Sequence, residues 1–173
     1  MTAITAELQA NVHASLQAVD PATLSRMSTR ELDGLFAELR PADLGELQGR
    51  KRGRVLALAG IDWVPAEARG LVFGLLAELP LWQGKIFEGE FGANAWLLPS
   101  FALQFARFLV REAPALEGEG EVLRLDYDVA ANPKLLRNIV CELRRLGPGQ
   151  FLARLKIRWR DRPVQVLYFS LST

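Results

Sequence analysis

The sequence is poor in the residues from which metal sites and nucleophilic centres are built. Its 173 residues include one cysteine and one histidine. A single cysteine excludes an internal disulfide and suits a reducing compartment, and with one histidine beside it a zinc site is nearly excluded. No apolar run approaches the ~18 residues of a membrane-spanning helix, and residues 1–20 lack the pattern of a secretory signal. We therefore expect a cytoplasmic protein without membrane insertion and without a metal or organic redox cofactor.

Net charge is also small. The chain carries 21 Lys and Arg against 20 Asp and Glu, a formal charge of +1 at pH 7. Such a balance provides no field that would gather nucleic acid. The basic run at residues 50–54 is typical of a solvated strand edge. The glycine pairs at 118–120 and 147–149 do not lead into a helix, as a nucleotide-binding loop must. We therefore expect no nucleic-acid or dinucleotide partner.

The lone histidine and cysteine have ordinary settings. His13 lies on the polar side of an expected helix, next to neither Asp nor Cys, so a surface position is favoured over a catalytic triad. Cys141 falls within an expected helix, without a base or a helix N-terminus to lower its pKa, and we expect it to be buried packing. The sequence thus contains no recognisable catalytic apparatus, and whether the protein is an enzyme stays open.

The composition is that of a folded chain, because half of the residues are hydrophobic and 24% are charged. The length suits one domain over residues 1–173. Apolar positions at helical spacing over 5–19, and a capping box at Ser28 and Glu31 before another apolar stripe, predict a helical layer over residues 1–40. Residues 46–173 would then form the remaining body, with neither a linker nor an internal repeat.

Alternating apolar and polar residues predict strands in this second part. The expected strands are 47–58, 82–87, 91–98, 101–111, 121–129 and 151–160, followed by a last strand. Residues 65–79 read as a short helix, and 101–111 would also suit a helix. Asn132 as N-cap, Pro133 at the first position and Gly147 after the end predict one C-terminal helix. Few helices between strands favour a mainly β fold with helices (α+β), whose antiparallel sheet curls into a barrel or half-barrel.

Two segments resemble motifs of small bacterial proteins named for a Gly-x-Trp-x-Gly motif. They are Gly49-Arg50-Lys51-Arg52-Gly53 and Trp82-Gln83-Gly84-Lys85-Ile86-Phe87, and the family carries a Trp-x-Gly-Lys-x-Phe segment after a short helix, as here. Lys51 stands where that family has its tryptophan. The resemblance covers roughly residues 35–173. It implies a bacterial protein with a lipocalin-like barrel and a lipophilic ligand, and it implies no particular activity.

Strand alternation predicts which side chains face the interior. Tyr127 would face inward with Leu123 and Leu125, and Trp159 with Leu155 and Ile157, while Asp126 and Asp128 point away. Arg154, Lys156, Arg158 and Arg160 would form a basic outer face. Segment 101–111 would contribute either Gln104, a neutral hydrogen-bonding group, or Arg107, which suits a ligand carboxylate or enolate. The expected ligand-binding residues are Tyr127, Arg107, Gln104, Trp82, Trp96, Trp159 and Tyr168.

Three function classes fit this interior. The first, which we predict, is binding of a lipophilic or aromatic small molecule inside a small β-barrel. The second is a cofactor-independent cyclase or isomerase that uses the same cavity to orient its substrate. The third is a structural or partner-binding protein whose barrel is filled, because small barrels can be either hollow or solid. A homodimer is compatible with all three.

Overall fold

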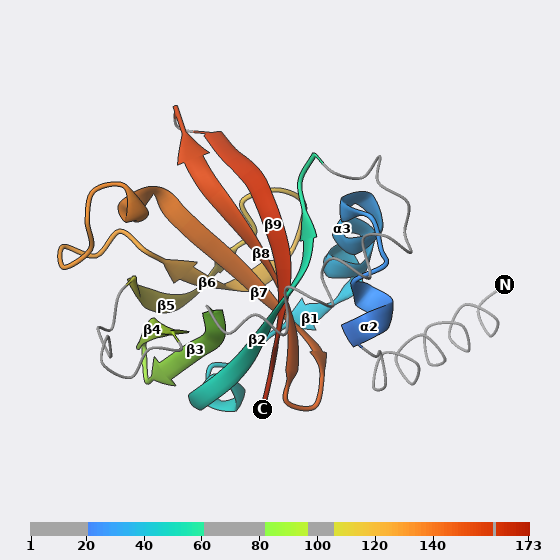
Figure 1. Ribbon diagram of the computed structural model, residues 1–173, viewed down its shortest axis with the longest axis horizontal. Helices are drawn as coiled ribbons and strands as arrows, with labels where there is room; N and C mark the ends of the chain where they lie inside the picture. Colours follow the sequence, from blue (N-terminus) through green and yellow to red (C-terminus); the bar gives the residue numbers. More distant parts are fainter. Residues whose placement is uncertain (1–20, 61–81, 97–105, 161) are drawn as a thin grey trace, which may run out of the picture.

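The computed structural model describes residues 21–60, 82–96, 106–160 and 162–173 (Figure 1). Within these residues, eight strands close into an antiparallel barrel. They are β2 (Gly49–Leu58), β3 (Trp82–Glu88), β4 (Phe91–Trp96), β5 (Arg107–Pro114), β6 (Glu121–Asp126), β7 (Ile139–Gly147), β8 (Gln150–Trp159) and β9 (Arg162–Ser172). Each strand pairs with the next along the chain, and β9 pairs back with β2. This up-and-down arrangement confirms the expected antiparallel barrel and closes it fully.

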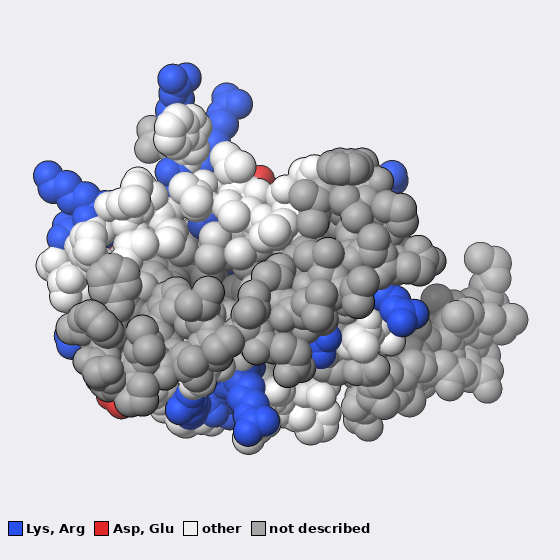
Figure 2. Space-filling model, in the orientation of Figure 1, with Lys and Arg blue, Asp and Glu red and all other residues white. Residues whose placement is uncertain are grey.

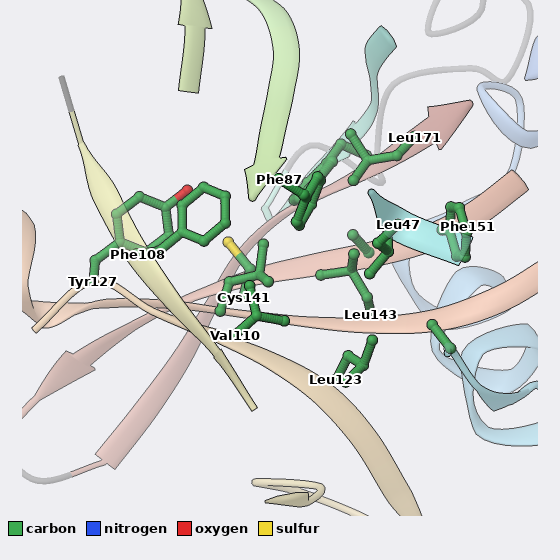
Figure 3. Close-up of a cluster of buried hydrophobic side chains, with 14 of the residues drawn as sticks. Leu47, Phe87, Phe108, Val110, Leu123, Tyr127, Cys141, Leu143, Phe151 and Leu171 are labelled. Atoms are coloured by element: carbon green, nitrogen blue, oxygen red, sulfur yellow. The ribbon is translucent and has the colours of Figure 1, made fainter. Parts of the chain in front are cut away.

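The barrel interior is packed with apolar side chains from most of its strands (Figure 3). In β5, for example, Phe108 and Val110 are buried while Arg107, Leu109 and Arg111 are exposed, the alternation of a strand with one face inward. The buried interior residues include Phe87, Phe108, Val110, Leu123, Leu125, Tyr127, Cys141, Leu143, Phe151, Ala153, Phe169 and Leu171. The predicted inward orientation of Leu123, Leu125 and Tyr127 is thereby confirmed.

A short 3-10 helix, η1 (Gly45–Leu47), lies at one end of the barrel. The Asp43 carboxylate accepts a hydrogen bond from the Gly45 amide at 2.6 Å, and the Gln48 side chain accepts one from the Gly89 amide at 2.8 Å. Gly89 belongs to the turn between β3 and β4, so η1 sits beside that turn. Leu47 is fully buried and belongs to the interior cluster. The two-residue strand β1 (Arg40–Pro41) pairs with β7 just before η1.

Two helices cover part of the outer face of the barrel (Figure 1). They are α2 (Pro21–Leu24) and α3 (Thr29–Glu38), and the capping box expected at Ser28 and Glu31 is present at the start of α3. A second apolar cluster joins Leu32 and Phe36 of α3 to the outer-face residues Leu56 and Tyr168. At the end of α3, Arg144 of β7 donates hydrogen bonds to the Phe36 and Ala37 carbonyls at 2.9 and 2.7 Å. This side chain satisfies carbonyls that a helix end leaves unpaired.

Arg154 and Lys156 lie on the outer face of β8, as expected, but this face is covered at their positions. Arg154 and Lys156 are buried, because α3 and the connection from β5 to β6 fold over them. Arg154 is paired with the fully buried Glu142 at 2.8 Å, and Lys156 is paired with Glu117. Arg158 pairs with Asp126 at 3.0 Å. The positive charges of this face therefore meet acidic partners from neighbouring segments.

The expected C-terminal helix is also wrong. Residues 132–147 form a 3-10 turn, η3 (Leu136–Asn138), followed by strand β7. Cys141 and Leu143 face the interior, whereas Val140 and Glu142 are buried on the outer face under the second layer. A strand buried on both faces has no exposed positions to break its apolar run, so its residues also matched a helical stripe. Asn132 is not an N-cap; its side chain bonds the backbone of β5.

Some expectations lie outside the described residues. These are the helix at 5–19 with His13, the helix at 65–79, and residues 101–105 with Gln104. The strand expected at 121–129 ends at Asp126, and the strand expected at 151–160 is β8. None of the described helices has the length and apolar character needed to cross a membrane.

Candidate functional site

A bulge in β3 brings Trp82 and Lys85 to the same face of the barrel wall. Trp82 pairs with Trp96 and Gly84 with Ala95, so β3 holds one extra residue at this point. Strict alternation would place Trp82 and Lys85 on opposite faces. Gly84 has φ +125°, and a Cβ atom there would lie 2.0 Å from the Lys51 carbonyl oxygen. Only glycine fits this position, and the bulge that it permits turns Lys85 inward beside Trp82.

Lys85 lies fully inside the barrel with two polar neighbours. Its Nζ is 2.7 Å from Asn94 Oδ1 on β4 and 2.5 Å from the hydroxyl oxygen of Tyr127, just beyond the end of β6. The Tyr127 hydroxyl in turn donates to Asn94 Oδ1 at 3.2 Å. The three side chains therefore form a closed hydrogen-bonded triangle, in which the lysine donates twice and the tyrosine accepts once and donates once.

Aromatic rings of Trp82, Phe108, Tyr127 and Phe169 surround the same amine. The distances from Lys85 Nζ to the ring centroids are 5.7, 4.9, 5.2 and 5.3 Å, within the range of cation–π contacts. Two glycines leave room for these rings. A Cβ on Gly53 would come within 2.4 Å of the Trp82 ring, and one on Gly92 within 2.3 Å of the Phe108 ring. The interior therefore holds one polar triangle inside an aromatic enclosure.

The electrostatics of this enclosure are unusual. Among the residues that the structure describes, no carboxylate forms an ion pair with Lys85. Burial lowers the pKa of the Lys85 amine from 10.5 to about 8. Burial also raises the pKa of the nearby Cys141 thiol to about 11, and it raises the pKa of Tyr127 well above its ordinary value. Near neutral pH, thiol and phenol stay protonated, while the lysine has a neutral fraction.

Cys141 completes the polar side of the interior. Its sulfur points toward the rings of Phe108 and Tyr127 (Figure 3). The thiol is fully buried, as expected from the sequence. A protonated thiol with a raised pKa is a poor nucleophile. Of the two groups, the amine is therefore the better nucleophile near neutral pH.

Two other buried lysines show what distinguishes Lys85. Lys156, on the outer face, is paired with the Glu117 carboxylate. Lys51, the register partner of Lys85 on β2, has its Nζ 3.3 Å from the Thr173 hydroxyl near the chain's C-terminal end. Lys51 and Lys85 thus both have neutral partners, and among the described lysines Lys85 is the one whose amine lies among aromatic rings. An amine held this way can act as a nucleophile or a base near neutral pH, and the adjacent phenol can donate a hydrogen bond to an oxygen.

Only some of the residues predicted for the site meet there. Tyr127 and Trp82 lie in the interior, and Trp82 packs edge-on against Phe169 with ring centroids 5.3 Å apart. Trp96 pairs with Trp82 in the ladder, and its side chain lies outside the described residues, as does Gln104. Arg107, one of the two alternatives for an inward polar residue in segment 101–111, is exposed, so this alternative is wrong. The register explains this, because Phe108 takes the inward position of β5.

The predicted inward positions of Trp159 and Tyr168 are also wrong. Trp159 is 64% exposed, because it pairs with Arg162 at the tip of the β8–β9 hairpin, beyond Ile157, the last residue of β8 that pairs with β7. Lys and Arg side chains gather around this tip (Figure 2). Tyr168 is buried on the outer face, where its hydroxyl donates to the Asp33 carboxylate. A bulge in the β8–β9 ladder, between the pairs Leu155–Leu167 and Lys156–Gln165, reverses the alternation assumed for Tyr168.

Sequence reasoning missed Lys85 and Asn94 as members of the site. Lys85 was visible only as part of the Trp82–Phe87 segment that carried the family resemblance. A glycine within a strand indicates a bulge, and Gly84 was the signal that the alternation shifts between Trp82 and Lys85. Among the described residues, no group of three or more His, Cys, Asp or Glu side chains could hold a metal ion.

Comparisons with known proteins support the fold. No family model matches the sequence, and no curated protein matches it. The structure is similar to the crystal structure of a protein from Thermomonospora curvata, with a TM-score of 0.50 and 18% sequence identity over 96% of this chain and 95% of that one. At this identity the likeness concerns the fold alone.

Proposed function

We propose that the barrel binds a lipophilic or aromatic small molecule in its interior, with the polar end of the ligand at Lys85, Asn94 and Tyr127. The observation that carries the proposal is the Lys85 amine, buried among aromatic rings and without a carboxylate partner in the described part of the chain. Burying a charge without a counter-charge destabilises a fold. A methionine would fill similar space without that cost, so packing does not account for the lysine.

The arrangement matches the chemistry of a small-molecule site. Aromatic side chains offer apolar contact area, and a few convergent polar atoms orient the ligand. The Lys85 amine and the Tyr127 hydroxyl can both donate to an oxygen on the ligand, while Asn94 Oδ1 holds the amine in place. Eight-stranded barrels have interiors that are either filled by side chains or hold one small ligand. Because the interior offers aromatic rings and a single cluster of polar atoms, the proposed ligand has an apolar body and a single oxygen-bearing end.

Native mass spectrometry of freshly purified protein tests this proposal. We expect a population heavier than the chain by the mass of one small molecule, which is released on denaturation. The released molecule should be largely apolar. A single unliganded mass, together with no saturable binding of the neutral lipophilic probe N-phenyl-1-naphthylamine, would support the filled barrel of a structural protein instead.

A matched pair of tyrosine variants locates the binding. Tyr127→Phe removes the hydroxyl inside the barrel, and Tyr168→Phe removes the buried hydroxyl on the outer face. For a ligand recovered from the protein, we expect Tyr127→Phe to weaken affinity about 5- to 15-fold, as the loss of one hydrogen bond does, and Tyr168→Phe to leave it unchanged. Equal effects of both variants would contradict an interior site.

A cofactor-independent isomerase is the second candidate, favoured by one observation. The Lys85 amine, with a pKa of about 8, lies beside a neutral phenol that can stabilise an enolate oxygen. Such a pair could remove a proton next to a ligand carbonyl. Incorporation of deuterium from D2O at that carbon, in wild type but not in Lys85→Met, would favour the isomerase over simple binding.

A further inference from the structure

We propose that Lys85 binds its ligand covalently, as a reversible imine with an aldehyde or ketone group on a lipophilic or aromatic molecule. This inference rests on the proposed function, since the ligand must first enter the barrel. It goes further because it names the chemical class of the ligand and the bond that holds it.

The geometry favours a carbonyl over other oxygen-bearing groups. A ligand carboxylate would form an ion pair with a protonated lysine, for which a surface-accessible ammonium or an arginine is better suited. Here the amine is enclosed by the rings of Trp82, Phe108, Tyr127 and Phe169, where ionisation is disfavoured. A desolvated amine in a hydrophobic pocket is the usual form of an imine-forming lysine.

The neighbours of Lys85 have the positions that imine formation requires. Asn94 Oδ1, 2.7 Å from Nζ, orients the amine, and the Tyr127 hydroxyl lies 2.5 Å from Nζ, close enough to exchange a proton with a group that bonds to this nitrogen. Tyr127 stays protonated, because burial raises its pKa well above the ordinary value. It can therefore act as a proton donor and acceptor beside the reacting atoms.

The reaction balances without an oxidant or a reductant. The lone pair of the neutral amine forms the C–N bond while the C=O π pair moves to oxygen, and that oxygen gains the proton that nitrogen loses, relayed by the Tyr127 hydroxyl. The nitrogen lone pair of this carbinolamine then forms the C=N bond as the hydroxyl, protonated by Tyr127, leaves as water. The nitrogen returns its remaining proton to Tyr127. The products are one imine and one water.

The sequence is well suited to a test, because it contains four lysines: Lys51, Lys85, Lys134 and Lys156. Lys134 is exposed, and Lys156 is buried with the Glu117 carboxylate beside it. Protein would be incubated with 6-methoxy-2-naphthaldehyde and sodium borohydride, which supplies a hydride to the imine carbon and leaves a stable secondary amine. Peptide mapping by mass spectrometry would then locate a gain equal to the aldehyde mass less one oxygen atom.

We expect modification at Lys85 in wild type at least about tenfold faster than at Lys134, since exposed lysines are almost fully protonated near neutral pH. Lys85→Met should lose this adduct, and Lys156→Met should keep it. Tyr127→Phe should slow the modification by a larger factor than the roughly 5- to 15-fold by which it weakens binding of the matched alcohol, (6-methoxy-2-naphthyl)methanol. Because the map identifies the modified lysine in wild type, the test does not depend on how well Lys85→Met folds.

The outcomes separate this inference from the proposed function. Saturable binding of both aldehyde and alcohol, with no reduced adduct at Lys85, would overturn the imine and leave the binding site intact. Labelling confined to Lys134 or the N-terminal amine would overturn it equally. If neither the aldehyde, the alcohol nor N-phenyl-1-naphthylamine binds, the proposed function itself fails, and the imine fails with it.

The rate of trapping should also rise with pH through about 8, as the Lys85 amine loses its proton. The groups that face it are Lys51 on β2, Asn94 on β4, Tyr127 after β6 and Cys141 on β7. Cys141, with a pKa of about 11, and Tyr127, higher than its ordinary value, keep their protons over this range. A rate that keeps rising toward pH 10, as for an exposed lysine, would contradict an enclosed amine.

Discussion

At the scale of single residues, Lys85 serves the proposed function at the expense of the stability of the fold. It is a fully buried amine whose partners are a phenol, an amide and aromatic rings. Tyr127 and Asn94 remain hydrogen-bonded to each other at 3.2 Å if the lysine is removed. If Lys85 has a structural role, its removal should lower the free energy of unfolding. If its role is chemical, removal should leave stability unchanged or raise it.

We therefore predict that Lys85→Met raises the free energy of unfolding at pH 7 by about 1–3 kcal/mol, as replacement of a buried charge by an apolar side chain often does. Denaturant unfolding monitored by circular dichroism would measure it, with Lys156→Met as the control that leaves Glu117 unpaired. A clear loss of stability in Lys85→Met would indicate that the hydrogen bonds and ring contacts of the lysine are structural.

The pH dependence of that difference follows from the lowered pKa. Below pH 8 the amine is protonated in both states, so its burial cost is constant, about 3 kcal/mol for a pKa lowered from 10.5 to about 8. Between pH 8 and 10.5 the unfolded state keeps a proton that the folded state has lost, so wild-type stability rises with pH. We expect the advantage of Lys85→Met to shrink over this window.

Two Trp→Ala variants compare the contribution to stability of a tryptophan in the barrel interior with that of one at the tip of the β8–β9 hairpin. Trp159 is 64% exposed, and we expect Trp159→Ala to change stability by less than about 0.5 kcal/mol. Trp82 packs on Phe169 and over Gly53, so Trp82→Ala should cost about 2–4 kcal/mol. Thermal or urea unfolding of both variants would measure the two effects. A large loss for Trp159→Ala would mean that the tip packs against another part of the protein.

At the scale of elements, the Asn132 side chain ties the connection from β6 to β7 to the neighbouring strand β5. Asn132 accepts a hydrogen bond from the Arg107 amide at 3.0 Å and donates to the Arg107 and Tyr127 carbonyls at 2.6 and 2.8 Å. It thereby joins this connection to β5 and fixes the backbone that presents Tyr127 to Lys85. The connection is part of the support for the site.

Asn132→Ala should lower the free energy of unfolding by about 1–3 kcal/mol, because buried backbone groups lose their partner. It should also slow trapping of the aldehyde at Lys85, since Tyr127 loses its support. Asn138→Ala, at an exposed position of η3, is the matched control and should do neither. Wild-type stability and trapping in Asn132→Ala would show that the connection is held by other contacts.

The outer layer depends on an ion pair that joins three elements. The Glu142 carboxylate of β7 accepts from Arg154 of β8 at 2.8 Å and from the Leu116 amide in the β5–β6 connection at 2.6 Å. Glu142→Ala should cost about 3–5 kcal/mol, because it leaves a buried guanidinium without its partner. The double variant Glu142→Met with Arg154→Met should recover part of that loss. Equal losses in single and double variants would contradict the coupling.

Sequence patterns predicted the elements whose two faces differ and missed those whose faces are alike. β6 and β8 alternate between apolar and polar residues, and the capping box of α3 is local chemistry, so each was predictable. β7 is buried on both faces, and nothing local separates it from a helix. The bulge at Gly84 depends on the approach of the β2 backbone, a contact that no single strand contains.

At the scale of the whole molecule, residues of the same type lie on opposite faces of the barrel wall. Tyr127 lies inside and Tyr168 outside, and Lys85 lies inside and Lys156 outside. The sequence predicted an aromatic interior and Tyr127 within it. The exposed positions of Trp159 and Arg107 could not be predicted, because strand register and hairpin length are set by pairing between strands.

The interior and the outer face also differ in how they treat charge. On the outer face, the buried Arg154 and Lys156 meet the carboxylates of Glu142 and Glu117, and the buried Arg144 meets backbone carbonyls. Inside, the Lys85 amine meets rings and neutral oxygens. This contrast within one molecule is the basis for assigning function to the interior.

The most direct measurement is nuclear magnetic resonance of protein labelled with 13C only in its lysines, with the Lys85 signal assigned by comparison with Lys85→Met. We predict that the Lys85 side-chain signal titrates with a midpoint near pH 8. At constant pH it should shift saturably as N-phenyl-1-naphthylamine is added, while the Lys134 and Lys156 signals do not respond to this probe. A Lys85 signal that titrates near pH 10.5 and does not respond to the probe would contradict a ligand site inside the barrel.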